Sequence, residues 1–158
     1  MKMGLITSIF ETLTLEQVID FAAETGLECL EVACWPSSGG AKRRYAGTCH
    51  IDAQALTKAR ADEINAYLAK KHVTISALAY YPNTLDPDLE KREAYIRHLR
   101  MLIDAAQLLG VGLVTTFLGR VPQWTVSRNL EEVKSVWPAI LDYAAEKGVR
   151  IAIENCPM

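Results

Sequence analysis

The apolar residues of this chain follow two different spacings. Five short apolar runs rich in β-branched residues have the length of buried strands. They cover residues 3–7, 29–33, 73–79, 113–117 and 149–153. The segments between them have helical spacing, and the clearest of these carries the stripe Ile96, Leu99, Ile103 and Ala106. The pattern therefore predicts five strands alternating with four helices.

Three stretches repeat one phrase, in which a helical pattern is followed by a glycine and then by an apolar run. They read "AAETGLECLEVA", "AAQLLGVGLVTTF" and "YAAEKGVRIAIE". Glycine just past the last helical turn adopts the left-handed backbone conformation that ends many helices. Each phrase predicts a junction from a helix to a strand.

Short polar side chains mark where the helices begin, because they accept hydrogen bonds from free N–H groups of the first turn. The expected N-cap residues are Thr14, Asp52, Asp86 and Asn129. Thr14 and Asn129 have a capping-box partner three residues later, and Asp86 precedes a proline suited to the first helical position. Pro138 interrupts the last helical pattern, so we expect a kink near Trp137.

Strict alternation of strands and helices predicts an α/β fold with a parallel sheet and right-handed crossovers. An open doubly wound sheet and a closed β/α barrel both satisfy this order. The segment after the first strand, "TSIFETLTLEQ", lacks the glycine fingerprint of dinucleotide-binding folds, which weakens the first alternative. Both architectures collect functional residues at the carboxyl ends of the strands.

Composition is that of one globular domain spanning residues 1–158, with 50% apolar and 23% charged residues. A net charge of -2 and a pI near 5.9 disfavour a nucleic-acid partner. No apolar run approaches the roughly 18 residues of a membrane span, and the N-terminus has no export-signal pattern. The cysteines Cys29, Cys34, Cys49 and Cys156 show no C-x-x-C spacing. We therefore expect reduced thiols, a cytoplasmic location and no membrane partner.

Three segments carry a resemblance to a known family. "GLECLEVACWP", "ISALAYYPNTLDPD" and "RIAIENCPM" resemble the second, third and fifth strands of sugar phosphate isomerases and epimerases with the xylose isomerase-like TIM barrel. The likeness runs through all 158 residues. A complete β/α barrel takes about 250 residues. The resemblance thus implies a truncated barrel, the N-terminal portion of the family's fold.

The resemblance also implies a chemistry. Family members hold a divalent ion with four side chains, usually Glu, Asp, His and Glu, at the ends of strands five to eight, and Glu154 matches the first of these. We expect Glu154 to be both a metal ligand and the catalytic base that moves a proton next to a sugar carbonyl. The implied metal is Mn²⁺, Mg²⁺, Co²⁺ or Zn²⁺, fully bound only with the missing strands present. The isolated chain is expected to show little turnover.

Two further residues are candidate substrate contacts, for a sugar or sugar phosphate. Glu31 is a charged residue within a buried strand, which fits either a polar contact to substrate or an internal ion pair. Trp35 follows that strand, where an aromatic ring either faces a sugar or closes the top of the barrel. The simpler interpretation of Glu154 is a strand-end carboxylate paired with a neighbouring Lys or Arg.

Two other functions remain open. The chain fits a non-catalytic half-barrel that pairs with a second copy of itself or with a separate chain, because an open half-barrel exposes strand edges. An apurinic-site endonuclease of the same superfamily is the other alternative. The absence of histidine from the strand ends "YYPN" and "TTFLGR" argues against that repair enzyme.

Overall fold

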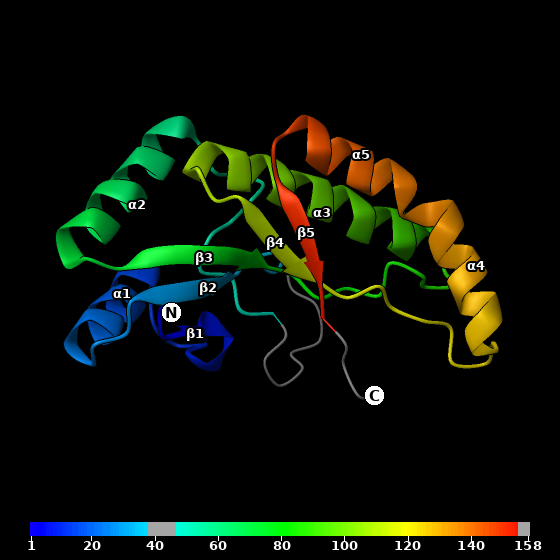
Figure 1. The fold of residues 1–158 in the computed structure, drawn as a ribbon, viewed down its shortest axis with the longest axis horizontal. Helices are drawn as coiled ribbons and strands as arrows, with labels where there is room; N and C mark the ends of the chain where they lie inside the picture. The colour runs from blue at the N-terminus through cyan, green and yellow to red at the C-terminus, as the bar shows by residue number, and fades with distance from the viewer. Residues whose placement is uncertain (38–46, 155–158) are drawn as a thin grey trace.

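A five-stranded parallel sheet forms the centre of the fold in the computed structural model, which describes residues 1–37 and 47–154. The strands are β1 (Gly4–Ile6), β2 (Cys29–Ala33), β3 (Thr74–Ala79), β4 (Leu113–Thr116) and β5 (Arg150–Ile153). Their spatial order is the chain order, and every adjacent pair is parallel (Figure 1). The five expected strands are therefore confirmed.

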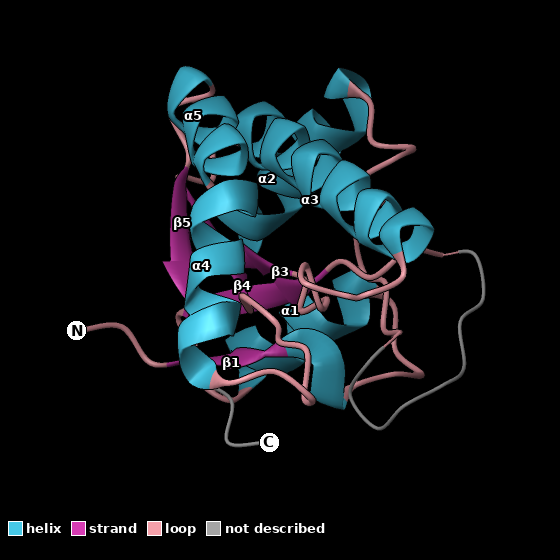
Figure 2. Ribbon diagram, turned by 90° about the vertical axis from the view of Figure 1, so that its right-hand side faces the viewer, coloured by secondary structure: helices cyan, strands magenta, loops and turns pink. Residues whose placement is uncertain are grey.

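The helices lie along one side of the curved sheet, as Figures 1 and 2 show. The α-helices are α1 (Leu15–Glu24), α2 (Lys58–Lys71), α3 (Leu89–Leu109), α4 (Val126–Val136) and α5 (Pro138–Glu146), and a 3-10 turn, η1 (Thr7–Ile9), follows β1. In the described part of the chain, each helix is too short or too polar to span a bilayer. This arrangement is part of a β/α barrel in which β1 and β5 form the two edges of the sheet.

The expected kink in the last helix lies at Trp137, which keeps helical backbone angles (φ −77°, ψ −30°) between α4 and α5. Trp137 is the C-cap of α4, and Pro138 begins α5. Proline cannot donate the next helical hydrogen bond, but its fixed φ suits the first position of a new helix. The count is therefore five α-helices among the described residues rather than the four expected.

The core lies between the helices and the outer face of the sheet. Alternate residues of the central strands, and Tyr80 just after β3, point toward the helices and are fully buried; the strand residues are Leu30, Val32, Leu78 and Val114. They belong to one cluster with the buried faces of α1, α3 and α5. In α3, the expected stripe residues Leu99, Ile103 and Ala106 are completely buried. This apolar layer fixes which side chains remain for the opposite face.

Helix ends follow the sequence pattern in part. Thr14 forms the expected capping box with Gln17, whose backbone N–H it accepts while Gln17 Oε1 accepts from Thr14 N at 2.9 Å. The three glycines of the repeated phrase, Gly26, Gly110 and Gly148, all have positive φ. These junctions are confirmed.

Asp86 is not the cap of α3. Its carboxylate accepts from the backbone N–H of Asp88 at 2.9 Å, and Asp88 in turn caps the helix by accepting from Glu90 and Lys91. Asp86 therefore stabilises the turn before the helix, which begins later than the proline suggested.

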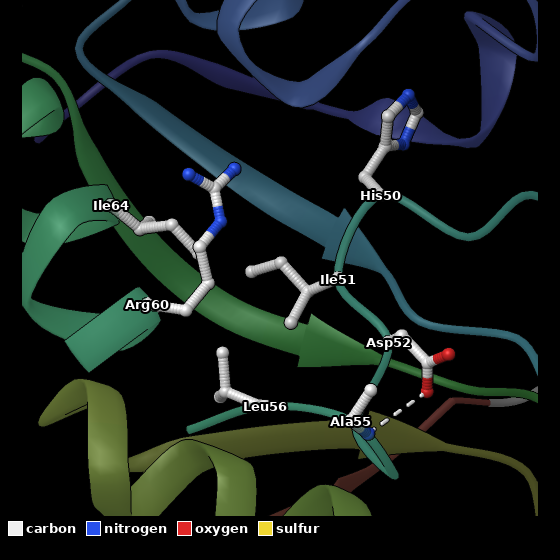
Figure 3. A pocket seen from close by; sticks show the side chains of 7 residues that line it. All are labelled: His50, Ile51, Asp52, Ala55, Leu56, Arg60 and Ile64. Carbon is white, nitrogen blue, oxygen red and sulfur yellow. Dashed lines mark hydrogen bonds between the residues drawn. The ribbon is translucent and has the colours of Figure 1, made fainter. Parts of the chain in front are cut away.

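Two other expected caps are also displaced. Asn129 lies inside α4, whose cap is Thr125, and its side chain instead binds both backbone groups of Val121. Asp52 closes a turn by accepting from Ala55 (Figure 3), and Thr57 caps α2. Asx turns and caps use the same bonds, so the sequence alone does not separate them.

Gly119, in the loop after β4, offers a test of this loop's packing. Its φ is +79°, and an added Cβ would lie 2.8 Å from Cα of Asn83 and closer still to that residue's amide oxygen. Asn83 holds the loop through Arg120, whose N–H it accepts at 2.9 Å. We expect Gly119→Ala to lower the free energy of unfolding by about 3 kcal/mol, since overpacking adds to the left-handed strain.

Gly110→Ala is the matched control, because Gly110 has a φ of +72° and open space around it. This substitution should cost only the left-handed strain of about 1 kcal/mol. Urea denaturation of the two variants gives the comparison. Equal losses would show that Asn83 does not constrain the loop.

Candidate active site

The strand register brings polar side chains onto the inner face of the sheet, opposite the core. Glu31 pairs with Ala77 in β3, and Ala79 pairs with Thr115 in β4. Thr115 pairs with Ala152 in β5. Paired residues share a face and alternate residues of one strand return to it, so Glu31 and Thr115 lie on the inner face.

Tyr81 and Glu154 reach the same face from just beyond two strands. Tyr81 lies two residues after Ala79, and Glu154 lies two residues after Ala152. The backbone N–H of Glu154 donates to the carbonyl of Thr116 at 2.9 Å, which extends the ladder past the end of β5. All four side chains thus converge at the carboxyl ends of the strands.

The four side chains form one hydrogen-bonded group, which we call the strand-end cluster: Glu31, Tyr81, Thr115 and Glu154. The Tyr81 hydroxyl is within hydrogen-bond distance of both carboxylates, lying 2.6 Å from Oε1 of Glu154 and also binding Oε1 of Glu31. The Thr115 hydroxyl donates to the same Glu31 oxygen at 3.1 Å. One phenol therefore links two carboxylates that are 123 positions apart (154 − 31) in the sequence.

Tyr81 is a neutral hydrogen-bond donor at physiological pH. Burial raises the pKa of Tyr81, and the hydrogen bonds to Glu154 and Glu31 raise it further. A phenolate would be poorly hydrated here and would lie between two carboxylates, so the proton is retained. The single proton serves one carboxylate at a time.

The two carboxylates differ in their surroundings. Glu31 is half-buried and is bound by two hydroxyl groups, Tyr81 and Thr115. Glu154 is exposed, and Tyr81 is its hydrogen-bond partner among the described side chains. For both glutamates, the partners within residues 1–37 and 47–154 are hydroxyls rather than a Lys or Arg.

Trp35 lies apart from this group. Its ring packs edge-on against Tyr80, with centroids 5.0 Å apart, and Tyr80 is buried in the core. Its backbone N–H donates to the carbonyl of Thr48 at 3.1 Å. The structure therefore brings Glu31 and Glu154 together but leaves Trp35 as a ring at the rim, and its contact with a sugar stays a prediction.

Sequence reasoning did not assign Tyr81 or Thr115 a role. The available signal was that residues two apart along a strand point to the same face. Using it to place Tyr81 beside Glu31 requires the register between β2 and β3. The ladder shifts by one residue between Leu30 and Glu31, which inserts Ser76 as an extra residue of β3. The Ser76 hydroxyl donates to the carbonyl of Leu30 at 3.1 Å. Without this bulge, Tyr80 and not Tyr81 would share the face of Glu31.

The described residues do not by themselves fit a divalent metal site. The cluster offers two carboxylates and two hydroxyls, and residues 1–37 and 47–154 contain no group of three or more His, Cys, Asp or Glu placed to hold an ion. Hard cations of this class take about six oxygen ligands. Glu154 is the exposed carboxylate of the cluster and would supply one of them.

A separate pocket lies between the segment 50–56 and α2 (Figure 3). Two of its polar side chains have partners: Arg60 pairs with Glu16 and Glu63, and Nε2 of His50 lies 3.1 Å from the carbonyl oxygen of Leu13. Nδ1 of His50 is buried without a hydrogen-bond partner among the described residues. Burial lowers the pKa of His50. The pocket shares no residue with the strand-end cluster.

Comparison with known proteins places the chain in a family. The family model described as xylose isomerase-like TIM barrel matches residues 19–158. The chain belongs to this family. A search of curated proteins found no significant match.

Solved structures share the fold over nearly the whole chain. A D-tagatose 3-epimerase-like protein has a TM-score of 0.71 and 20% identity, over 100% of this chain and 54% of that one. D-psicose 3-epimerase from Clostridium cellulolyticum H10, crystallised with D-tagatose, has a TM-score of 0.68 and 16% identity, over 97% and 52%. The IolI protein with a bound zinc atom gives 0.68 and 18%, over 97% and 51%. The chain spans about half the length of these proteins.

The Tyr81 hydroxyl should make stability depend on alkaline pH. The unfolded chain loses a phenolic proton near pH 10, at about the ordinary tyrosine value, whereas folded Tyr81 keeps it because its pKa is raised. Its stabilising contribution is thus complete below pH 10 and is lost as pH rises above that value. Near neutral pH, Tyr81→Phe should cost about 1–3 kcal/mol for the lost hydrogen bonds to carboxylates.

Urea denaturation at several pH values tests this prediction. Above about pH 10, the wild type should lose stability more steeply than Tyr81→Phe. Tyr95→Phe, on α3 and outside the cluster, is the control and should keep the wild-type slope. Identical slopes for wild type and Tyr81→Phe would show that the phenol is not held between the carboxylates.

Proposed function

We propose that this chain carries the sugar-binding and acid–base residues of a sugar isomerase or epimerase. The observation that carries the proposal is the strand-end cluster, where two carboxylates and two hydroxyl donors meet at the carboxyl ends of β2 to β5. Active sites of β/α barrels lie at this end. The family membership and the epimerases among the similar structures support the same reaction class.

Proton transfer beside a sugar carbonyl needs a base and a donor for the oxygen that gains charge. Glu154 suits the base, because it is exposed and has a single described hydrogen-bond partner, Tyr81. Tyr81 suits the donor, because its raised pKa keeps the proton on the phenol. Glu31 then holds Tyr81 in place together with Thr115. A carbonyl oxygen that binds Tyr81 would release Glu154 to accept the carbon-bound proton.

A divalent metal is part of the proposal only in a limited sense. Glu154 would be one ligand of such an ion, and the other ligands are not among the described residues. The zinc in the structure of the IolI protein supports metal use in proteins of this fold. A cytoplasmic location belongs to the same proposal.

Ketose binding tests the proposal directly. D-Tagatose and D-fructose should bind the protein in saturation-transfer NMR, because each presents a carbonyl and several hydroxyls to the cluster. Glu154→Gln, Glu31→Gln and Tyr81→Phe should each weaken binding about tenfold, since a hydrogen bond to a charged group is worth about 1.5 kcal/mol or more. In D₂O, the 158-residue chain should bind ketose without exchanging its carbon-bound protons.

Glu146→Gln is the matched control, because Glu146 is an exposed carboxylate that ends α5 at the opposite end of the sheet. Its ketose affinity should equal that of the wild type. The proposal is wrong if no ketose binds, or if the three cluster variants bind as well as the control.

A second candidate function is association of two half-barrels. Among the described residues, β1 pairs only with β2 and β5 only with β4, so the sheet has two open edges. Ile153, at the end of β5, is 49% exposed. Unpaired strand edges with apolar side chains favour pairing with another chain.

Light scattering coupled to size-exclusion chromatography checks this association. The wild type should elute with the mass of two chains, and Ile153→Lys should shift it to one chain, because a charge at an edge strand opposes pairing. Leu141→Lys is the control, since Leu141 is 45% exposed but lies on α5. A monomeric wild type at every concentration would contradict the half-barrel dimer.

A further inference from the structure

Two free cysteines lie directly opposite one another beyond the end of β2. Cys34 follows β2, and Cys49 lies on a short segment that runs antiparallel to it, forming an isolated bridge between the two residues. The flanking hydrogen bonds are Trp35 N–H to the carbonyl of Thr48, at 3.1 Å, and His50 N–H to the carbonyl of Ala33, at 2.9 Å. Both sides of the cysteine pair are thus fixed by backbone bonds.

This bonding pattern identifies the pair as a non-hydrogen-bonded one, because the bonds join the residues before and after each cysteine. In such pairs the Cα atoms are about 4.5 Å apart and the side chains approach more closely than in the hydrogen-bonded type. Directly opposed side chains also lie on one face of the ladder. A disulfide needs Cα atoms about 4.4–6.8 Å apart. The backbone therefore already has a spacing that a disulfide accepts.

The Cys49 thiol also acts electrostatically on the Cys34 thiol, which agrees with their closeness. The Cys34 thiol is completely buried, and burial raises its pKa, with repulsion from Cys49 adding to the effect. Cys49 is partly exposed, and burial together with Asp52 raises its pKa to about 11. The thiolate is the reactive form, so both thiols react slowly at neutral pH.

We propose that Cys34 and Cys49 form a disulfide when the chain meets a small-molecule disulfide such as oxidised glutathione. The partly exposed Cys49 thiolate attacks one glutathione sulfur, which breaks the glutathione disulfide and releases one glutathione thiolate. The Cys34 thiolate then attacks the Cys49 sulfur and releases the second glutathione. The two cysteine protons pass to the two glutathione thiolates, so the oxidant gains the two electrons that the cysteines lose.

The bond would close a covalent ring over residues 34–49 at the rim that carries the strand-end cluster. It would tie the segment that leads to α2 to the end of β2, next to the ring of Trp35. This inference does not rest on the proposed sugar chemistry, since it follows from backbone pairing alone.

Mass spectrometry of the whole protein, treated with oxidised glutathione at mildly alkaline pH and then alkylated, tests the proposal. Before alkylation, the oxidised wild type should weigh two hydrogen atoms less than the reduced protein. After alkylation it should carry two labels, on Cys29 and Cys156. Trypsin cleaves at Lys42, Arg43 and Arg44, so the disulfide should join the peptides 3–42 and 45–58. Fragmentation of the joined peptides assigns the bond to Cys34 rather than Cys29.

Two variants complete the experiment. Cys29→Ser should form the disulfide as the wild type does, because Cys29 is also partly exposed but is not opposite Cys49. Cys49→Ser should leave Cys34 reduced, because Cys34 is buried and the partly exposed thiol that reacts first with oxidised glutathione is missing. The inference is overturned if Cys49 keeps a bound glutathione while Cys34 stays alkylatable, if the bond involves Cys29 or a second chain, or if the protein is unchanged.

Discussion

Parallel pairing of the strands in chain order is the constraint on which the rest of this structure depends. Each crossover returns the chain to the same end of the sheet, so whatever follows each strand reaches a common rim. Glu31, Thr115 and Glu154 meet only because three ladders hold their strands side by side. The bulge at Ser76 decides which tyrosine joins them, because a slip of one residue exchanges the two faces of β3.

The two faces of the sheet consequently have different tasks. The outer face carries large apolar side chains under the helices, whereas the inner face carries alanines and the polar cluster. Two carboxylates near one phenol repel each other, and the hydrogen bonds from the Tyr81 and Thr115 hydroxyls offset this repulsion. Thr115 gives Glu31 a second hydrogen-bond donor, so Glu31 keeps one hydrogen bond when the Tyr81 hydroxyl donates to another acceptor. Glu154 has no such second donor among the described residues.

The sequence was most informative where many residues combine into one signal. Five strands, the glycine junctions and the Thr14 capping box follow from apolar spacing and backbone preference, and the family resemblance agrees with the fold that was found. Asp86 and Asp52 were misplaced as caps because an Asx turn uses the same side-chain bonds as a helix cap. Asn129 was misplaced because its side chain binds the backbone of Val121, in the loop before α4. Tyr81 was missed for a different reason. Its face depends on a bulge, which is a property of two strands together and leaves no mark in either one.

The two carboxylates of the cluster also differ in how firmly their strands are held. β2 lies between β1 and β3, and where β1 ends, Thr7 accepts the Ala33 N–H at 2.9 Å and the segment around Cys49 continues the pairing. Glu31 therefore stands on a strand supported along both sides to its end. β5 has only β4 as a described neighbour, and Glu154 lies one residue past its last paired position. In the proposed chemistry the more firmly held carboxylate, Glu31, positions the phenol, and the less constrained one, Glu154, takes the proton; the difference in support between them follows from the order of the strands.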